Sequence, residues 1–290
     1  MAPNPPACYC GAAMPSAPPA AIDDATWHRV LARNPGPEGH PPLYAAFLAP
    51  PTHPDGCVVL GRIAQTLDGR IATESGMSFW ISGPEDILHT HRLRAVCEAI
   101  VVGAGTVKAD DPLLTTRLCP GPSPVRVVID TDRRLADSYR MFQGGPPTLL
   151  LAADDLAGSD RLGTAEVVRL PRANTGGPTT GGPTTGGFST GGLAIPAVIA
   201  ALAARGLHRI FVEGGGITVS RFLAAGALDR LHITVAPLLL GAGIPAFTLP
   251  GVAKPEDGLR LTWDIHHLGQ DLLFDIPLVR ASARGPLVRA

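Results

Sequence analysis

The sequence predicts an α/β protein with a mixed, mostly parallel sheet, helices on both faces of that sheet, and a C-terminal antiparallel hairpin. Short apolar runs of strand length recur along the chain, and several are separated by stretches with helix signals. Strands that alternate with helices are typical of a parallel sheet. The last two apolar runs are joined by a short polar turn, which is typical of an antiparallel pair.

The composition is that of a globular body without a strong overall charge. The 290 residues are 45% apolar and carry a formal net charge of −1, so we expect neither nucleic acid nor an anionic membrane as a partner. No apolar run approaches the ~20 residues of a membrane span, and the N-terminus lacks signal-peptide features, which together predict a cytoplasmic protein. The five cysteines are scattered and no zinc-ligand set is complete, so no metal is predicted.

The chain divides into an arm, one folded domain and a tail. Residues 1–55 are rich in Pro and Ala and predict a partly disordered arm, with one short helix within 24–34. The folded domain is predicted over 56–278 and the tail over 279–290. Within the domain, 174–192 repeats the unit GGPTT and predicts a low-complexity surface loop, although an interdomain linker has the same composition.

The first half of the domain predicts strands around one long helix. Residues 57–64 are almost continuously apolar and predict a buried central strand. A helix is predicted from about Pro84 to about Val96, with Ser82 as its cap. A strand at 99–102 then ends in glycines, and we expect a loop from there to Thr116. Three more strands are predicted, at 124–130, 148–152 and 166–170.

The second half predicts two more helices and the closing strands. A helix over 195–205 has a Pro in its first turn and is stopped by Gly206. The elements that follow are a strand at 208–212, a helix over 220–225, either a strand pair or one strand bent around Pro237 over 231–240, and the hairpin of 259–267 with 271–276.

Two of the predicted strands end in glycine-rich turns, where open α/β sheets bind ligands. The first turn, from Gly103 to Thr106, lacks the third small residue of the dinucleotide fingerprint because Lys108 holds that place, so an ordinary turn stays open. The second, Glu213-Gly-Gly-Gly, opens a helix whose N-terminal N–H groups favour a phosphate or pyrophosphate. On its own, this turn is as typical of a simple connection as of a phosphate site.

Charged residues between these turns are candidates for phosphate binding and acid–base chemistry. Arg94 and Arg117 are candidates to clamp a phosphate, and their pairing with Ser78 and Thr116 favours this, although each arginine alone is more typical of a solvated surface. Asp68 and Asp110 are candidate acid–base groups, and the competing interpretations are an Asp-Gly turn and a loop cap.

Several motifs follow one another in order over about residues 57–276. They are TLDGRIA at 66–72, GMSFWIS at 76–82, HRLRA at 91–95, AIVVGAGTVKADDPLLTTR at 99–117, RVVID at 126–130, FVEGGG at 211–216, FLAAGALDRL at 222–231 and APLLLG at 236–241. In this order and spacing they resemble the reductase domain of riboflavin biosynthesis, a family with the dihydrofolate-reductase-like fold.

The resemblance implies an NADPH-dependent reduction in which the ribose of a ribosylamino-pyrimidine 5′-phosphate becomes a ribityl chain. Hydride passes to the sugar C1′ through an opened imine, and the protein supplies orientation and charge. The resemblance also implies a homodimer, with no interface specified by the sequence.

The family's site residues are carried over by matching position. The implied NADPH-binding residues are Ala64, Trp80, Gly103, Thr106, Asp110, Thr131, Gly215, Gly216, Ile217, Thr218 and Arg221. The implied substrate-binding residues are Ser78, Arg94, Leu114, Arg117 and Glu213. Glu213 and Asp68 are the candidate catalytic residues.

The chain departs from the family pattern in three places. Many relatives carry Lys in the first strand where this chain has Arg62, and a guanidinium does not readily release a proton. The 174–192 insert is not typical of the family. Residues 1–56 contain neither H-x-E nor P-C-x-x-C, the signature of the zinc deaminase that often precedes this domain, so we expect reduction without deamination.

Three functions stay open at this point. The first is the riboflavin-pathway reductase, with either the deaminated or the diamino pyrimidine as substrate. The second is a reductase of the same fold that acts on a pterin or another pyrimidine-like substrate; it would not need Ser78, Arg94 and Arg117, because an unphosphorylated pterin has no phosphate for them to bind. The third is a non-catalytic nucleotide-binding module, which would bind NADPH without turnover.

Overall fold

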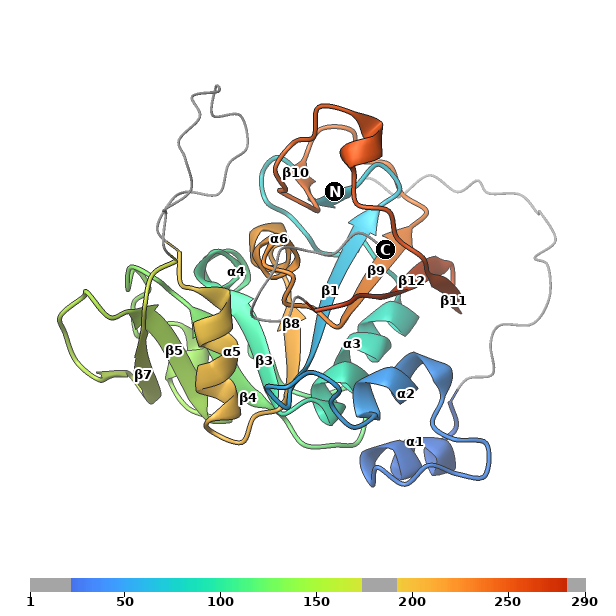
Figure 1. The fold of residues 1–290 in the computed structure, drawn as a ribbon, viewed down its shortest axis with the longest axis horizontal. Coiled ribbons are helices and arrows are strands. Elements are labelled where there is room, and N and C mark those ends of the chain that lie inside the picture. Colours follow the sequence, from blue (N-terminus) through green and yellow to red (C-terminus); the bar gives the residue numbers. More distant parts are fainter. Residues whose placement is uncertain (1–21, 174–191, 281–290) are drawn as a thin grey trace, which may run out of the picture.

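The computed structural model describes residues 22–173 and 192–280, arranged around a ten-stranded sheet (Figure 1). The strand order is β11-β12-β9-β1-β8-β3-β4-β5-β7-β6. The parallel strands are β1 (Val58–Thr66), β3 (Ala99–Gly103), β4 (Val125–Ile129), β5 (Thr148–Ala153), β7 (Ala165–Leu170), β8 (Arg209–Glu213) and β9 (Arg230–Ala236). The antiparallel ones are β6 (Arg161–Leu162), β11 (Asp264–Leu268) and β12 (Asp271–Pro277). The predicted fold class is therefore confirmed, whereas the predicted surface loop lies almost wholly outside the described residues.

Helices cover both faces of the sheet because successive strand residues point to opposite sides. On one face, Leu60 and Ile100 pack with α1 (Asp24–Leu31), α2 (Pro42–Leu48), α3 (Pro84–Val96) and α4 (Ala104–Asp110). On the other, Val59 and Val101 pack with α5 (Ile195–Ala203) and α6 (Gly216–Ala224). Figure 1 shows α5 in front of the sheet. A small second sheet pairs β2 (Arg70–Ala72) with β10 (Ile244–Pro245).

The N-terminal segment is part of the folded body over the residues that the structure describes. The sequence predicts a partly disordered arm with one helix, but α1 and α2 both pack against the core through Trp27, Tyr44 and Phe47, each at most 2% exposed. The Trp27 indole Nε1–H also donates to the Pro120 carbonyl oxygen at 2.9 Å. The sequence did not indicate this packing for two reasons. The segment is rich in Pro and Ala, and α2 has only seven residues and no polar face.

Replacing Trp27 with Ala should lower the free energy of unfolding by about 3–5 kcal/mol, because a buried aromatic side chain and its hydrogen bond are lost. Urea denaturation of the full chain measures this. Leu259→Ala is the control, since Leu259 is 50% exposed and its truncation should cost less than about 0.5 kcal/mol. Equal stability of the two variants would contradict the packed N-terminal segment.

Other elements differ from prediction in position rather than in kind. The stretch after β3 forms α4, whereas a loop was predicted. The helix was not predicted because its short Ala-Gly-Thr-Val sequence carries little helix signal. Gly83, not Ser82, is the residue at the N-cap of α3. Helix α6 starts at Gly216, four residues earlier than predicted, and β9 ends before Pro237 as a single strand.

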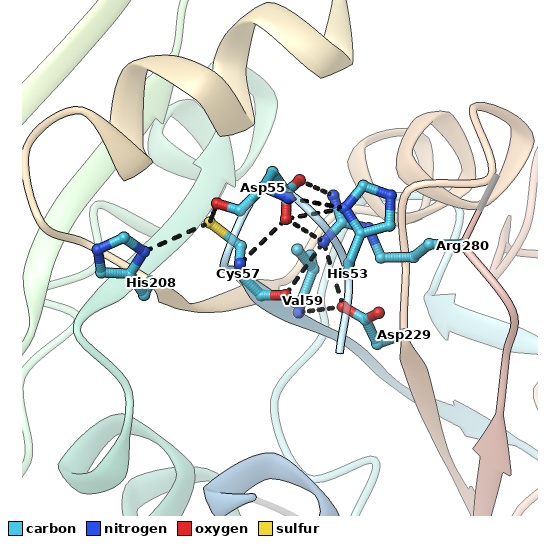
Figure 2. Close-up of polar contacts among 7 residues, drawn as sticks. All are labelled: His53, Asp55, Cys57, Val59, His208, Asp229 and Arg280. Carbon is cyan, nitrogen blue, oxygen red and sulfur yellow. Dashed lines mark hydrogen bonds and ion pairs between the residues drawn. The ribbon is translucent and has the colours of Figure 1, made fainter. Parts of the chain in front are cut away.

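The C-terminal strand leads into an anchor at the amino ends of β1, β8 and β9 (Figure 2). Arg280, the last described residue and the second of the predicted tail, has a side chain that is 5% exposed and pairs with Asp55 and with Asp229. Cys57 and His208 also lie here, with Sγ and Nδ1 4.0 Å apart. Burial raises the pKa of the Cys57 thiol to about 11, so this pair lacks an activated nucleophile and serves the fold.

Candidate active site

The carboxyl ends of four neighbouring parallel strands, β1, β8, β3 and β4, meet at one edge of the sheet, opposite the anchor of Figure 2. A cleft of about 1580 Å³ opens there. Every predicted binding residue lines it: Ala64, Ser78, Trp80, Arg94, Gly103, Thr106, Asp110, Leu114, Arg117, Thr131, Glu213, Gly215, Gly216, Ile217, Thr218 and Arg221. The sheet topology thus brings together residues from distant parts of the chain.

Asp68 is the one predicted site residue that does not line this cleft. Its carboxylate accepts hydrogen bonds from the Thr66 hydroxyl at 2.5 Å and from the Gly241 N–H at 2.7 Å. The Thr66 hydroxyl, more than any other group, lowers the pKa of Asp68 to about 2. A carboxylate held ionised in this way stabilises the turn between β1 and β2, and we leave Asp68 out of the catalytic set.

One half of the cleft is shaped for a dinucleotide. Gly214 and Gly215 have φ values of 75° and 65°, a backbone conformation that favours glycine, and they bring the start of α6 against Thr106. A Cβ on Gly103 would lie 2.4 Å from the Thr218 Oγ1. The end of β3 can therefore approach the start of α6 this closely only because residue 103 is a glycine.

The first N–H groups of α6 are free to bind an anion. Those of Gly216 and Ile217 have no partner among the described hydrogen bonds, as expected at a helix N-terminus. The helix dipole adds partial positive charge at this point. The turn is therefore suited to bind a phosphate or pyrophosphate group.

The far end of this half lies at the end of β4 and was only partly predicted. Thr131 lines it as expected, together with Arg134 and Arg172, which the sequence analysis did not select. The Asp130 carboxylate faces inward and accepts from the N–H groups of Arg134 and Leu135 at 3.0 and 2.9 Å, so it caps the turn. An arginine beside the adenosine ribose is the usual device for a 2′-phosphate.

The other half of the cleft narrows into a cavity of about 250 Å³ between α3 and the end of β8. Its lining is Arg62, Ser82, Asp86, Ile87, Thr90, His91, Arg94, Arg117 and Glu213. We call it the cationic cavity, because three arginines line it. Ser78, predicted to act with Arg94 and Arg117, lines only the wider cleft.

Arg94 and Glu213 face each other in this cavity as an ion pair. The Arg94 Nε donates to Glu213 Oε2 at 2.8 Å, and its Nη2 donates to Oε1. Burial alone would lower the pKa of Arg94, but the Glu213 carboxylate outweighs it and raises that pKa. Arg94 Nη1 also donates to the Thr115 carbonyl at 3.2 Å, so the same side chain fixes the loop that carries Arg117.

A second ion pair lies beneath the first. Arg62, on β1 opposite Glu213, pairs with Asp86 at the start of α3, and Asp86 also accepts from the Thr234 hydroxyl at 2.7 Å. Burial acts to raise the pKa of Asp86, but the Arg62 guanidinium outweighs it and holds the pKa below its ordinary value. Both residues therefore stay charged, and Arg62 contributes fixed charge rather than a proton.

Two non-glycine residues that line the cleft have a positive φ. Trp80 has a φ of 70° and is 89% exposed, so its indole ring stands at the open mouth of the cleft. Leu114 has a φ of 52° but is buried. A non-glycine residue with such a φ is held by its surroundings and often marks a functional site. Both were assigned by position in the motif, and no local turn signal would have found them.

Within the described residues, no helix is long and apolar enough to cross a membrane, and no three His, Cys, Asp or Glu side chains gather as metal ligands.

Comparison with known proteins decides the family. The model of the RibD C-terminal domain family matches residues 58–274. The chain belongs to the RibD C-terminal domain family. The N-terminal helices α1 and α2 lie outside the matched stretch, although they are part of the same folded body.

Two curated relatives of the RibD C-terminal domain family differ in length. The 2,5-diamino-6-ribosylamino-4(3H)-pyrimidinone 5′-phosphate reductase of Methanothermobacter thermautotrophicus is 33% identical over 224 residues, which cover 75% of this chain and 96% of that protein. The riboflavin biosynthesis protein RibD of Bacillus amyloliquefaciens is 33% identical over 211 residues, or 71% of this chain but 51% of that protein. The chain thus spans nearly all of the archaeal relative and about half of the bacterial one.

Solved structures support the fold alone. The chain is 22% identical to the Thermotoga maritima deaminase/5-amino-6-(5-phosphoribosylamino)uracil reductase, with a TM-score of 0.61 over 81% of this chain and 58% of that one. It is also 22% identical to the Saccharomyces cerevisiae riboflavin biosynthesis reductase Rib7, with a TM-score of 0.57 over 77% of this chain and 90% of that one. Both likenesses agree with the reductase-domain fold inferred from the motifs.

Proposed function

We propose that this chain is an NADPH-dependent reductase of riboflavin biosynthesis that converts the ribose of a ribosylamino-pyrimidine 5′-phosphate to a ribityl chain. One observation carries the proposal: a single cleft joins a glycine cradle for a dinucleotide to a cationic cavity at the end of β8. The relative from Methanothermobacter, named for reduction of such a phosphate, spans the same stretch and supports it. The reductase domain is 56–278, with α1 and α2 packed against it.

Each half of the cleft has its own task. The cofactor supplies the hydride that the sugar C1′ accepts, and one proton completes the reduction of the opened imine. The start of α6 and Thr106 orient the dinucleotide from the glycine side. Arg117, which has no ion pair among the described residues, holds the 5′-phosphate, and Arg94 adds its charge beside it. Ser78 contacts the substrate from the wider part of the cleft.

Glu213 lies where the two halves meet, at the carboxyl end of β8. Its carboxylate, held by Arg94, can accept a hydrogen bond from a sugar hydroxyl or a pyrimidine N–H. Arg62 of the neighbouring strand β1 lies opposite it. Glu213 is thus the residue we propose for positioning the reacting sugar.

NADPH is proposed over NADH because Arg134 and Arg172 line the far end of the cofactor half. Asp132 pairs with both side chains, which fixes their guanidinium groups near the end of β4. A homodimer, as the family resemblance implies, and a cytoplasmic location complete the proposal.

Absorbance at the nicotinamide band tests the function directly. The purified chain is mixed with NADPH and either the deaminated or the diamino ribosylamino-pyrimidine phosphate. We expect oxidation with at least one of them, and the faster substrate defines whether reduction precedes deamination. Tight NADPH binding without oxidation by either pyrimidine would refute the proposal and favour a pterin substrate or a binding role.

A further inference from the structure

His91 lines the cationic cavity together with Arg94 and Arg117 and has no role assigned so far. It is a residue of α3 and is 3% exposed. Its Nδ1 lies 3.0 Å from the backbone N of Arg117, whose N–H must donate to it. Nδ1 is therefore unprotonated, and the proton of the neutral ring is on Nε2.

The Nε2–H group of His91 is available to donate a hydrogen bond to a ligand. It has no hydrogen-bond partner among the described residues, yet it is not sealed in the protein interior, since the ring contacts the cavity. Burial, and then the charges of Arg94 and Arg117, lower the pKa of His91 to about 4 against the opposing charge of Glu213. At neutral pH the ring is thus an uncharged donor.

The cavity needs such a donor because most of its positive charge is already paired. Glu213 occupies the fork of Arg94, and Asp86 occupies that of Arg62. In the described part of the chain, Arg117 forms no ion pair, and its Nη1 donates only to the Thr115 hydroxyl at 3.2 Å. A phosphate dianion in the cavity would meet one unpaired guanidinium, and its remaining oxygens would need further donors.

We propose that His91 is a further substrate-binding and positioning residue, whose Nε2–H donates to the phosphate of a sugar 5′-phosphate while Nδ1 holds the Arg117 backbone in place. This inference deepens the proposed function and rests on it for the identity of the substrate. The chemical class that the cavity recognises is a phosphate monoester on a pentose.

Two substitutions of His91 test the roles of Nδ1 and Nε2 separately. In His91→Asn, the amide oxygen lies near the position of Nδ1 and can accept from the Arg117 N–H, but nothing replaces Nε2–H. In His91→Gln, the longer amide can donate near the position of Nε2, but the acceptor for Arg117 is lost. Thermal unfolding of both variants reports whether the fold is kept.

Binding of ribose 5-phosphate to the full-length chain is the first readout, with ribose as the probe without a phosphate. His91→Asn should raise the Kd for ribose 5-phosphate about tenfold, which is the usual effect of losing one hydrogen bond to a charged group. Ribose binding and the NADPH Kd should be unchanged. In the reduction assay, the same variant should raise KM at unchanged kcat. Wild-type affinity in His91→Asn, or no binding of ribose 5-phosphate by the wild-type chain, would overturn the inference.

Nitrogen-15 NMR of the wild-type imidazole keeps the inference testable if a variant does not fold. The Nε2 resonance of His91 should shift when ribose 5-phosphate is added and not when ribose is added, and an unchanged resonance would overturn the inference. The outcome is separable from that of the proposed function. A chain that binds ribose 5-phosphate through His91 but reduces no pyrimidine would leave the inference intact and remove the function. Reduction with unchanged KM in His91→Asn would do the reverse.

Discussion

Arg94→Ala should lower kcat/KM for the pyrimidine substrate by about 10³-fold, which corresponds to ~4 kcal/mol, and leave the NADPH Kd unchanged. The side chain is 10% exposed and holds three groups: both carboxylate oxygens of Glu213 and the Thr115 carbonyl. Its removal leaves the Glu213 charge facing the phosphate and frees the loop that carries Arg117. Steady-state kinetics together with fluorescence titration of NADPH measure the two quantities.

Two matched variants give the Arg94 result its meaning. Arg94→Lys keeps the charge but not the planar fork, and should recover only part of the activity. Arg205→Ala removes an exposed arginine that pairs with Glu166 outside the cleft, and should leave kcat/KM within about twofold of wild type. Full activity in Arg94→Ala would place the phosphate elsewhere.

Gly215→Ala should raise the NADPH Kd about 10²-fold or more, because the cofactor cradle cannot hold a side chain there. Gly215 has a φ of 65°, and a Cβ would lie 2.8 Å from the Thr106 Oγ1. The start of α6 must then move away from α4, and its free N–H groups leave the pyrophosphate position. Fluorescence titration with NADPH gives the Kd directly.

Gly206→Ala is the control for backbone strain. Gly206 has a φ of 75° after α5, but nothing lies within 4 Å of its added Cβ and it does not line the cleft. Both variants should lose about 1–2 kcal/mol of stability from the left-handed backbone, but only Gly215→Ala should lose affinity for NADPH. An equal loss of affinity in both would show that general destabilisation, not the cradle, is responsible.

The secondary structure could be predicted where apolar residues form a run of strand or helix length. Strands β3 and β5 are buried on both faces and have almost continuously apolar sequences. Helices α2 and α4 were not predicted, because each has only seven residues and no clear separation of an apolar face from a polar face. Their stability comes from tertiary packing, as the buried Tyr44 and Val107 show.

The site was predictable through its motifs, and its electrostatics were not. The motif positions placed Arg94 and Glu213 among the substrate contacts, but their mutual ion pair depends on the geometry between α3 and β8. Asp86 and His91 are ordinary polar residues of a helix in the sequence. Their roles depend on tertiary contacts, because Asp86 meets Arg62 of β1 and His91 meets the Arg117 backbone only in the folded chain.

The fate of the hydride is the measurement that tests the central claim most directly. The reduction assay is run with NADPH deuterated at the transferred position of the nicotinamide, and the product is analysed by mass spectrometry and NMR. We expect one deuterium per product molecule, at C1′ of a ribityl chain, with the 5′-phosphate intact. Deuterium retained on the nicotinamide, or found on the pyrimidine ring, would contradict a reductase that acts on the sugar.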